Sequence, residues 1–461
     1  MPKTVSVAVS NATFHFDKLY TYAVMPDQQE AVRLGSMVLV PFGRGSKARM
    51  GVVLACDEEP EHAKLKYLFD VAPASACLTP ELLRLVHFLK ERTFCTYYEA
   101  VKAVIPYGAQ YKPALAADGV TPVLQKQLTR HTENSYKLVG SLQQKPRPTA
   151  KQLAAVALLS GGERTQNEME AHGITKAVLD NLCAKGVVEC SKVNKSIDLY
   201  SSIPLKNEPI TLTAEQQEAY DALLPGLEDT APHSALLYGV TGSGKTLVFL
   251  KLIERCLALG RRALVLVPEI SLTPQMILRL KSRFGRRVAV QHSALNHTER
   301  LLQWQMIQDG GADIVVGTRS AVFAPLETIG LVIIDEEQEH TYRSESAPRY
   351  AAQEVARQRA AENGSLLLLA SATPSTESFY AARNGRTQLV RLTQRYGGAP
   401  GCPASRSWIC GQSWPRATRG RSALPWRTPS GATSTRGSRR FCCSTAGATR
   451  PWPSATTAAR C

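Results

Sequence analysis

The sequence predicts a multidomain protein in which a β-rich domain and a small helical domain precede a doubly wound α/β domain. Short strands alternate up to about residue 60, and three short helical segments lie between residues 152 and 185. From residue 235 onward, apolar runs alternate with helical segments. This last pattern is typical of a parallel sheet that is covered by helices on both faces. A length of 461 residues is enough for about three such domains.

The first segment alternates like strands at 5–9, 21–24, 36–40 and 50–54, with glycines at the turns. Between the last two strands lies the loop 41–47, in which Phe42 could stack on a base and Arg44 could hold a phosphate. A solvated hairpin with Phe42 in the core is the alternative, and it stays open because exposed charges are common in loops.

Residues 79–105 have helical spacing, and we expect a linker at 108–123. Three short helices at 152–159, 166–172 and 176–185 then precede a strand at 187–189. This order favours a winged-helix unit whose recognition helix is 174–185. An ordinary helical spacer remains the alternative.

The stretch YGVTGSGKT at 238–246 fits the phosphate-binding pattern with Gly239, Gly244, Lys245 and Thr246 at its fixed positions, and Gly242 is a further candidate for nucleotide binding. It follows an apolar run typical of a strand and precedes a segment with helical spacing, which is the setting that the pattern requires. Backbone N–H groups and the start of the helix would hold phosphate oxygens. We expect the lysine to reach the outer phosphates of a nucleoside triphosphate and the threonine to bind Mg²⁺.

Further apolar runs typical of buried strands follow, at 263–267, 288–291, 314–316, 331–334 and 366–369. Two of them end in polar residues, where ligands of such sheets bind.

The run 331–334 is followed by Asp335 and Glu336, and 366–369 leads into Ser371-Ala372-Thr373. Asp335 is expected to hold Mg²⁺ and Glu336 to orient or deprotonate water, so that Lys245, Asp335 and Glu336 form the catalytic set. The hydroxyls at 371 and 373 could relay the state of the γ-phosphate, and Glu337 has no role in this scheme.

Charge and cysteine usage are consistent with a reduced, cytoplasmic protein and a polyanionic partner. Lys and Arg exceed Asp and Glu by 16, but residues 401–461 hold ten Arg and no acid, so only +6 belongs to residues 1–400. The amino terminus lacks the apolar stretch of a signal peptide, and no run is long enough to cross a bilayer, so we expect no membrane association.

The sequence resembles superfamily 2 helicases, and among them the family of replication-restart (primosomal) helicases. The resemblance covers about residues 4–400 and is carried by these stretches: VPFGRG (40–45), GVTGSGKT (239–246), VPEISLTPQ (267–275), HSALNHTER (292–300), VVGTRSAVFAP (315–325), IIDEEQEHTYR (333–343) and LASATPS (369–375). It implies a DNA 3′-end-binding domain at 1–110, a winged helix at 115–203 and a RecA-like, ATP-binding helicase lobe at 205–399.

The activity that this resemblance implies is ATP-driven 3′→5′ unwinding, with ATP and Mg²⁺ as cofactors. The implied partners are forked and single-stranded DNA, single-stranded DNA-binding protein, and the primosome proteins that load the replicative helicase.

The resemblance also assigns residues. Adenine would be read by Gln216, and the DNA-contacting residues would be Tyr20, Thr21, Phe42, Arg44, His292, Thr318, Arg319, Tyr342, Arg343, Arg349 and Tyr350. Of these, residues 342–350 would form an aromatic-rich loop that couples DNA to ATP. Gln338 departs from the family, where many members have His; because Gln does not titrate near neutrality, this change bears on coupling rather than on ATP binding.

The segment 400–461 differs from the rest of the chain. It holds four of the five Trp and five of the eleven Cys without apolar periodicity or paired thiols, and we expect it to be disordered. Read one base out of frame, its codons can encode stretches of the family's second lobe, including the start of a zinc site, so we interpret it as a frameshifted tail.

Zinc is therefore expected for the full-length family but not for this chain. Without a second lobe, which supplies an arginine to the γ-phosphate, we expect weak ATP binding and no unwinding. The alternative is a binding module for DNA forks and 3′ ends whose nucleotide site is vestigial. A nucleotide-hydrolysing protein unrelated to DNA is disfavoured by the 315–325 and 369–375 stretches.

Overall fold

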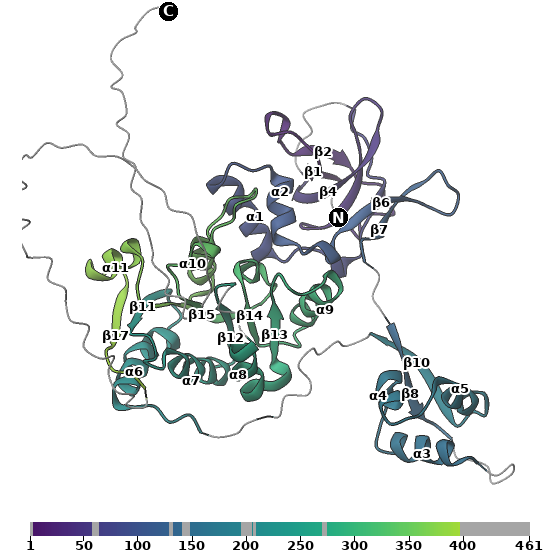
Figure 1. Ribbon diagram of the computed structural model, residues 1–461. Helices are drawn as coiled ribbons and strands as arrows, with labels where there is room; N and C mark the ends of the chain where they lie inside the picture. The colour runs from purple at the N-terminus through teal and green to yellow at the C-terminus, as the bar shows by residue number, and fades with distance from the viewer. Residues whose placement is uncertain are drawn as a thin grey trace, which may run out of the picture. The chain divides into compact units, whose positions relative to one another are not determined.

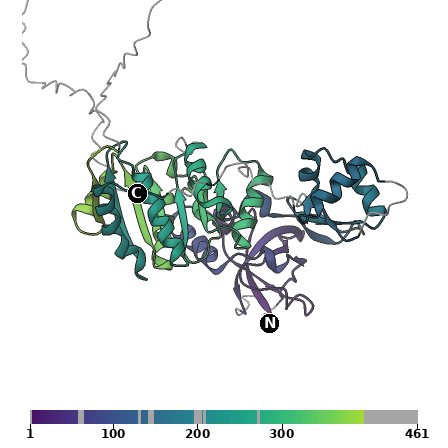
Figure 2. The ribbon, with the colours of Figure 1, turned by 90° about the horizontal axis from the view of Figure 1, so that it is seen from below.

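The computed structural model describes residues 3–57, 64–128, 132–140, 148–194, 205, 209–269 and 274–396 (Figures 1 and 2). These residues form an amino-terminal sheet domain, a small helical domain with its own sheet, and a large domain built on a parallel sheet. The segment 400–461, with its predicted frameshift, lies outside the described residues, and so do residues 270–273 of the VPEISLTPQ stretch.

The amino-terminal domain is an antiparallel sheet with the strand order β2-β1-β4-β3-β5. Its strands are β1 (Thr4–Val9), β2 (Tyr20–Ala23), β3 (Met37–Phe42), β4 (Lys47–Cys56) and β5 (Asp70–Val71). The four strands predicted between residues 5 and 54 are confirmed. One face of the sheet packs its valines against each other, while the other face packs against the helices that follow.

Two helices, α1 (Pro80–Arg92) and α2 (Tyr97–Val104), occupy the stretch that has continuous helical spacing in the sequence. The break arises because Thr96 and Glu99 form a capping box that starts a new helix, each side chain bonding the other residue's backbone N–H. Single-turn 3₁₀ helices lie at Phe14–Phe16, Ala74–Ala76 and Tyr107–Ala109.

The linker expected at 108–123 is wrong for most of its length, because this stretch contributes to the β-hairpin β6 (Tyr111–Leu115) and β7 (Pro122–Lys126). The hairpin is fixed to the domain by a hydrogen bond from the Leu124 N–H to Asp70 Oδ2 (2.7 Å) and by burial of Tyr111.

The helical domain has the helices and the strand that the sequence predicts, and its identity as a winged helix stays a prediction. Its elements are β8 (Thr132–Leu138), α3 (Ala150–Leu159), β9 (Arg164–Thr165), α4 (Gln166–Ala171), α5 (Lys176–Ala184) and β10 (Val188–Asn194). The antiparallel sheet has the order β10-β8-β9, and β8 was not predicted. Its core is its own, centred on Tyr136, Met169 and Leu179, which are fully buried.

The large domain contains a parallel sheet of the order β13-β14-β12-β15-β16-β11-β17. Its strands are β11 (His233–Gly239), β12 (Arg262–Leu266), β13 (Val288–Gln291), β14 (Ile314–Gly317), β15 (Ile329–Asp335), β16 (Leu366–Ser371) and β17 (Gln388–Leu392). Its α-helices are α6 (Ala214–Glu228), α7 (Lys245–Ala258), α8 (Pro274–Phe284), α9 (His297–Gln308), α10 (Ala352–Asn363) and α11 (Thr376–Arg383), with 3₁₀ helices at Gly285–Arg287, Arg319–Phe323 and His340–Tyr342. The predicted doubly wound α/β fold is therefore confirmed.

The sheet separates two apolar layers. Along β16, Leu366 and Leu368 face the layer that contains α6 and α7, whereas Leu367 and Leu369 face the layer that contains α10. This explains why the strands are apolar at every position rather than at alternate ones. The order β15-β16-β11 places the end of β16 between the phosphate-binding loop and the acidic end of β15.

A buried arginine connects the large domain to the amino-terminal domain. Arg359 on α10 is 0% exposed, and its guanidinium donates to both carboxylate oxygens of Glu81 on α1 (2.8 and 3.0 Å). It also donates to the carbonyls of Val322, Ala324 and Leu326 (2.7–3.2 Å). The fork geometry of Arg suits such a multiply bonded, buried position.

Candidate nucleotide-binding and DNA-binding sites

The phosphate-binding loop connects β11 to α7. Gly242 and Gly244 have φ of +80° and +81°, a conformation that favours glycine. A Cβ on Gly239 would lie 2.7 Å from Ser243 Oγ, so a larger residue at this position would require the Ser243 hydroxyl to shift. Gly244 is the N-cap of α7, which begins at Lys245, and the first N–H groups of an α-helix favour anions. The local sequence thus builds an anion-binding turn.

The catalytic residues predicted from the sequence meet at one cleft of about 750 Å³, whose lining includes Lys245, Thr246, Asp335 and Glu336. Lys245 Nζ donates to the Gly239 carbonyl (3.0 Å) and lies 3.6 Å from Glu336 Oε1. The lysine is thus partnered within the protein, and a bound triphosphate would compete for it.

Burial, and then the neighbouring Glu336 charge, raises the pKa of Asp335 to about 6, while Lys245 acts in the opposite direction. A hydroxyl and a carboxylate that line one cleft are the hard oxygen donors that Mg²⁺ prefers, so Thr246 and Asp335 fit this ion. Among the described residues, no cluster of three or more His, Cys, Asp or Glu forms a metal site.

Gln338 connects the acidic end of β15 to the end of β16. Its Nε2 donates to Glu336 Oε2 (3.1 Å), and its Oε1 accepts from Ser371 Oγ (2.6 Å). An amide can make both bonds at once because it carries a donor and an acceptor. The residue that departs from the family pattern therefore joins the two predicted clusters in this structure.

Glu337, for which the sequence predicts no role, is buried and accepts three hydrogen bonds from the start of α11. The donors are the Ser375 N–H, Ser375 Oγ and Ser378 Oγ, at 2.7–3.1 Å. Only the position of Glu337 beside the Asp335-Glu336 pair could have drawn attention to it, because its partners lie about 40 residues away.

Gln216 lies next to the loop but not in the lining of the cleft. It is 1% exposed, its Nε2 donates to the Ser243 carbonyl (2.8 Å), and its Oε1 accepts from the Thr213 N–H (3.0 Å). In this arrangement its amide supports the loop. Its reading of adenine stays a prediction.

The predicted DNA-contacting residues near β15 fall into two groups. Arg343 and Arg349 are exposed, as a DNA contact requires. Tyr342 is fully buried and donates its hydroxyl to the Asp335 carbonyl (2.7 Å), and Tyr350 is 9% exposed with its ring against Phe323.

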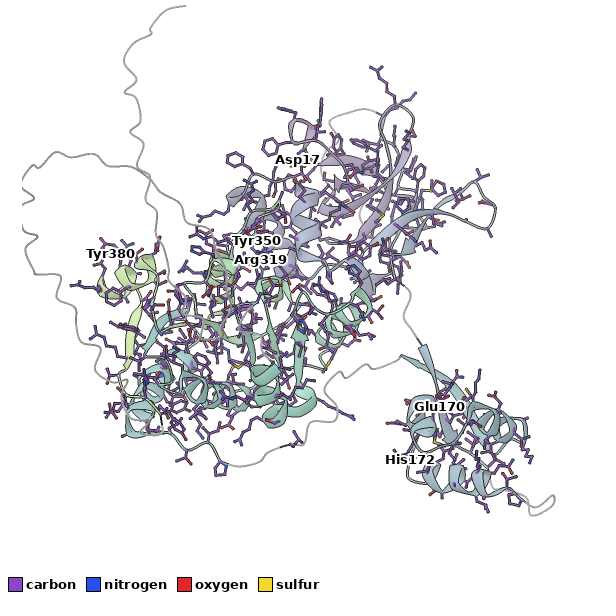
Figure 3. The ribbon with its side chains drawn as sticks, viewed as in Figure 1. Asp17, Glu170, His172, Arg319, Tyr350 and Tyr380 are labelled. Atoms are coloured by element: carbon purple, nitrogen blue, oxygen red, sulfur yellow. The ribbon has the colours of Figure 1, made fainter. Side chains whose placement is uncertain are left out.

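Arg319 also lies in this region, beside Tyr350 (Figure 3). It donates to the Thr341 and Arg343 carbonyls, which fixes the predicted aromatic loop to the 315–325 stretch. The rings of both tyrosines are covered by protein in this structure, and their stacking on bases stays a prediction.

His292 and Thr318 are also largely covered. Thr318 is 7% exposed, and burial followed by the Arg300 charge lowers the pKa of His292. His292 Nε2 is buried without a hydrogen-bond partner.

The amino-terminal domain has a second cleft of about 400 Å³, lined in part by Tyr20, Thr21 and Phe42. The rings of Tyr20 and Phe42 meet edge to face with centroids 5.0 Å apart. Lys66 lines the same cleft, and its Nζ donates to the Gly43 carbonyl (2.9 Å) and to Ser46 Oγ (3.1 Å). Arg44 is exposed at the tip of the loop and does not line the cleft.

Three lysines of this cleft were missed from the sequence. Lys18, Lys64 and Lys66 line it together with the predicted aromatics, but each lies well before or after the predicted loop in the sequence, so no local pattern groups them with it.

Comparison with known families identifies two of these domains. Residues 5–106 match the 3'DNA-binding domain (3'BD) of PriA, and residues 213–380 match the DEAD/DEAH box helicase domain. The replication restart protein PriA of Bacillus subtilis is 32% identical over 84% of this chain and 55% of that protein. PriA of Treponema pallidum is 42% identical over 50% of this chain and 35% of that protein.

The chain is similar to PriA proteins over most of its length. It spans about half the length of the curated relatives that it matches. Among solved structures, RecG bound to a three-way DNA junction is similar to this chain, with a TM-score of 0.31 and 23% identity. The similarity covers 43% of this chain and 27% of the RecG chain. Within the described residues, no helix combines the length and apolar character that a bilayer crossing needs.

Proposed function

We propose that the described residues are the ATP-binding and DNA-end-binding part of a replication-restart helicase that moves 3′→5′ on forked and single-stranded DNA. One observation carries this proposal: the chain combines two clefts. One is the phosphate-binding cleft that Asp335 and Glu336 line, in the part that matches the DEAD/DEAH box helicase domain, and the other is the aromatic cleft in the part that matches the 3'DNA-binding domain. Single-stranded DNA-binding protein and the primosome proteins are the proposed partners, in the cytoplasm.

Each residue of the nucleotide cleft has a proposed task. Lys245 would exchange its bonds to Gly239 and Glu336 for the outer phosphates, since its 3.6 Å contact with Glu336 is long and the Glu336 side chain is 30% exposed. Thr246 and Asp335 would hold Mg²⁺, which neutralises phosphate charge when it is bound. Glu336 would orient or deprotonate the attacking water.

The contacts of Gln338 suggest how the nucleotide state reaches the DNA side. A displacement of Glu336 on ATP binding would pull on Gln338 and, through it, on Ser371 at the end of β16. Tyr342 is bonded to the backbone of Asp335, so the aromatic loop is attached to the same acidic end. We propose that this loop exposes Tyr342 and Tyr350 to DNA only when the acidic end moves.

The second candidate function is a DNA 3′-end-binding module with a vestigial nucleotide site. It is favoured by the burial of Tyr342 and Tyr350, which keeps the coupling loop away from DNA in this conformation.

One comparison separates the two functions. The affinity of the full chain for forks with a free 3′ end, and for forks whose 3′ end is blocked by a phosphate, is measured with and without ATP and Mg²⁺. If the chain is part of a helicase, it should bind forks with a free 3′ end more tightly, and ATP should alter this affinity. Lys245→Ala should abolish the effect of ATP. A preference for the free end that ATP does not alter indicates the binding module, whereas equal binding to both forks contradicts both functions.

A further inference from the structure

The segment 393–396, directly after β17, lies against the phosphate-binding loop. The Glu215 carboxylate on α6 accepts from the Thr393 N–H (2.6 Å), from Thr393 Oγ1 (2.7 Å) and from the Gln394 N–H (3.0 Å). At the other end, the Tyr396 N–H donates to the Gly242 carbonyl (2.8 Å). The segment is therefore attached both to the start of α6 and to the loop itself.

The side chain of Tyr396 lines the same cleft as Lys245 and Asp335 and is 50% exposed. Its Cβ would be only 3.4 Å from a Cβ placed on Gly244, so the residue lies directly beside the loop. Its backbone is held by Gly242, but the ring has an open face. A half-exposed aromatic ring with a fixed backbone is costly to leave in water and suited to stacking on a planar ligand.

The cleft offers few other surfaces of this kind. Its remaining apolar lining consists of aliphatic side chains and one proline, namely Pro209, Ile210, Val240, Leu247 and Leu250. The amide of Gln216, the residue expected to read the base, is bonded to the loop and to its own helix start. Of the described residues that line the cleft, Tyr396 is the aromatic one.

We propose that Tyr396 is a nucleoside-binding residue that stacks on the base of the bound nucleoside triphosphate, and that Glu215 is a positioning residue that holds the segment carrying it. This inference rests on the proposed function, because the phosphates must be held by the loop for the base to reach the ring. Stacking is tolerant of base identity, so Tyr396 adds affinity for nucleosides in general over bare polyphosphate.

The test compares ATP with inorganic tripolyphosphate, each with Mg²⁺, by calorimetric titration of the full chain. Tyr396→Ala should bind ATP about tenfold more weakly, as loss of one base-stacking contact predicts, and tripolyphosphate as tightly as before. Tyr396→Phe should behave like the unaltered chain because it keeps the ring. Tyr380→Ala is the matched control, since Tyr380 is exposed on α11 and does not line the cleft (Figure 3).

Glu215 is tested by the same ratio of affinities. Glu215→Ala should weaken the binding of ATP but not of tripolyphosphate, and Glu215→Gln should lose less ATP affinity than Glu215→Ala. The double variant of Glu215→Ala with Tyr396→Ala should bind ATP no more weakly than Tyr396→Ala alone. A merely structural role for Glu215 would weaken both ligands equally, which would contradict its assignment.

Three results for Tyr396→Ala would overturn the proposal: unchanged ATP affinity, an equal loss for both ligands, or tighter binding of both, as expected if the ring only obstructs the cleft. Failure of the underlying function looks different. In that case Lys245→Ala would leave the binding of ATP and tripolyphosphate unchanged.

Discussion

Replacing Arg359 by Ala should strongly destabilise the chain, because the guanidinium is fully buried and makes five hydrogen bonds of 2.7–3.2 Å. The substitution leaves the Glu81 carboxylate, whose side chain is 14% exposed, without its arginine, and three carbonyls without their donor. Breaking a buried ion pair on one side costs about 3–5 kcal/mol, and each buried carbonyl left unpaired adds to that cost. We therefore expect a loss of at least about 3 kcal/mol in the free energy of unfolding.

Urea unfolding, followed by circular dichroism, measures this loss. Arg357→Ala is the matched control, since it lies on the same helix with an exposed side chain and should change the free energy by less than about 0.5 kcal/mol. Arg359→Lys should recover only part of the loss, because an ammonium cannot reproduce the fork. A loss below about 1 kcal/mol for Arg359→Ala would refute the reasoning, since the arginine would then not be buried and multiply bonded.

Three further predictions concern the two clefts and the acidic end of β15. The pKa of Asp335 is raised from 3.8 to about 6, so its ionised carboxylate destabilises the fold above about pH 6, and this destabilisation disappears as the pH falls towards 4. Asp335→Asn should therefore raise the midpoint of urea unfolding at pH 7 but not at pH 4. A higher midpoint at pH 4 but not at pH 7 would contradict this prediction. Lys66→Ala should reduce the slope of log affinity for 3′-ended DNA against log salt by about one, whereas Lys112→Ala, an exposed change in the same domain, should not. Glu337→Ala should lower the free energy of unfolding by about 1–3 kcal/mol and speed hydrogen exchange in α11, because three donors lose their acceptor. Unaltered hydrogen exchange in α11 would show that the carboxylate is dispensable.

The parts of the fold that the sequence predicts are those governed by local rules. Glycines with positive φ, a strand before them and a helix after them specify the phosphate-binding loop, and continuous apolar runs specify a sheet buried on both faces. The hairpin of β6 and β7 was mistaken for a linker because its stability depends on Asp70 and on the neighbouring sheet, which lie outside its own sequence.

The candidate sites follow the same division. Lys245, Thr246, Asp335 and Glu336 belong to short motifs and were found, although their catalytic roles stay predictions. The burial of Tyr342 was not foreseen, since an aromatic residue in a motif looks the same in sequence whether it faces DNA or the core. Residues brought in from a distance, such as Lys66 and Tyr396, were missed because only the folded chain places them beside their clefts.

The central claim, that the cleft at the end of β11 is a nucleotide site, is tested most directly by titrating the full chain with ATP and Mg²⁺ in a calorimeter. We expect saturable binding at one site per chain that Lys245→Ala weakens at least about tenfold, because the ammonium of Lys245 lies in the loop that would hold the outer phosphates. Binding of equal strength in Lys245→Ala and the unaltered chain, or no binding to either, would contradict it.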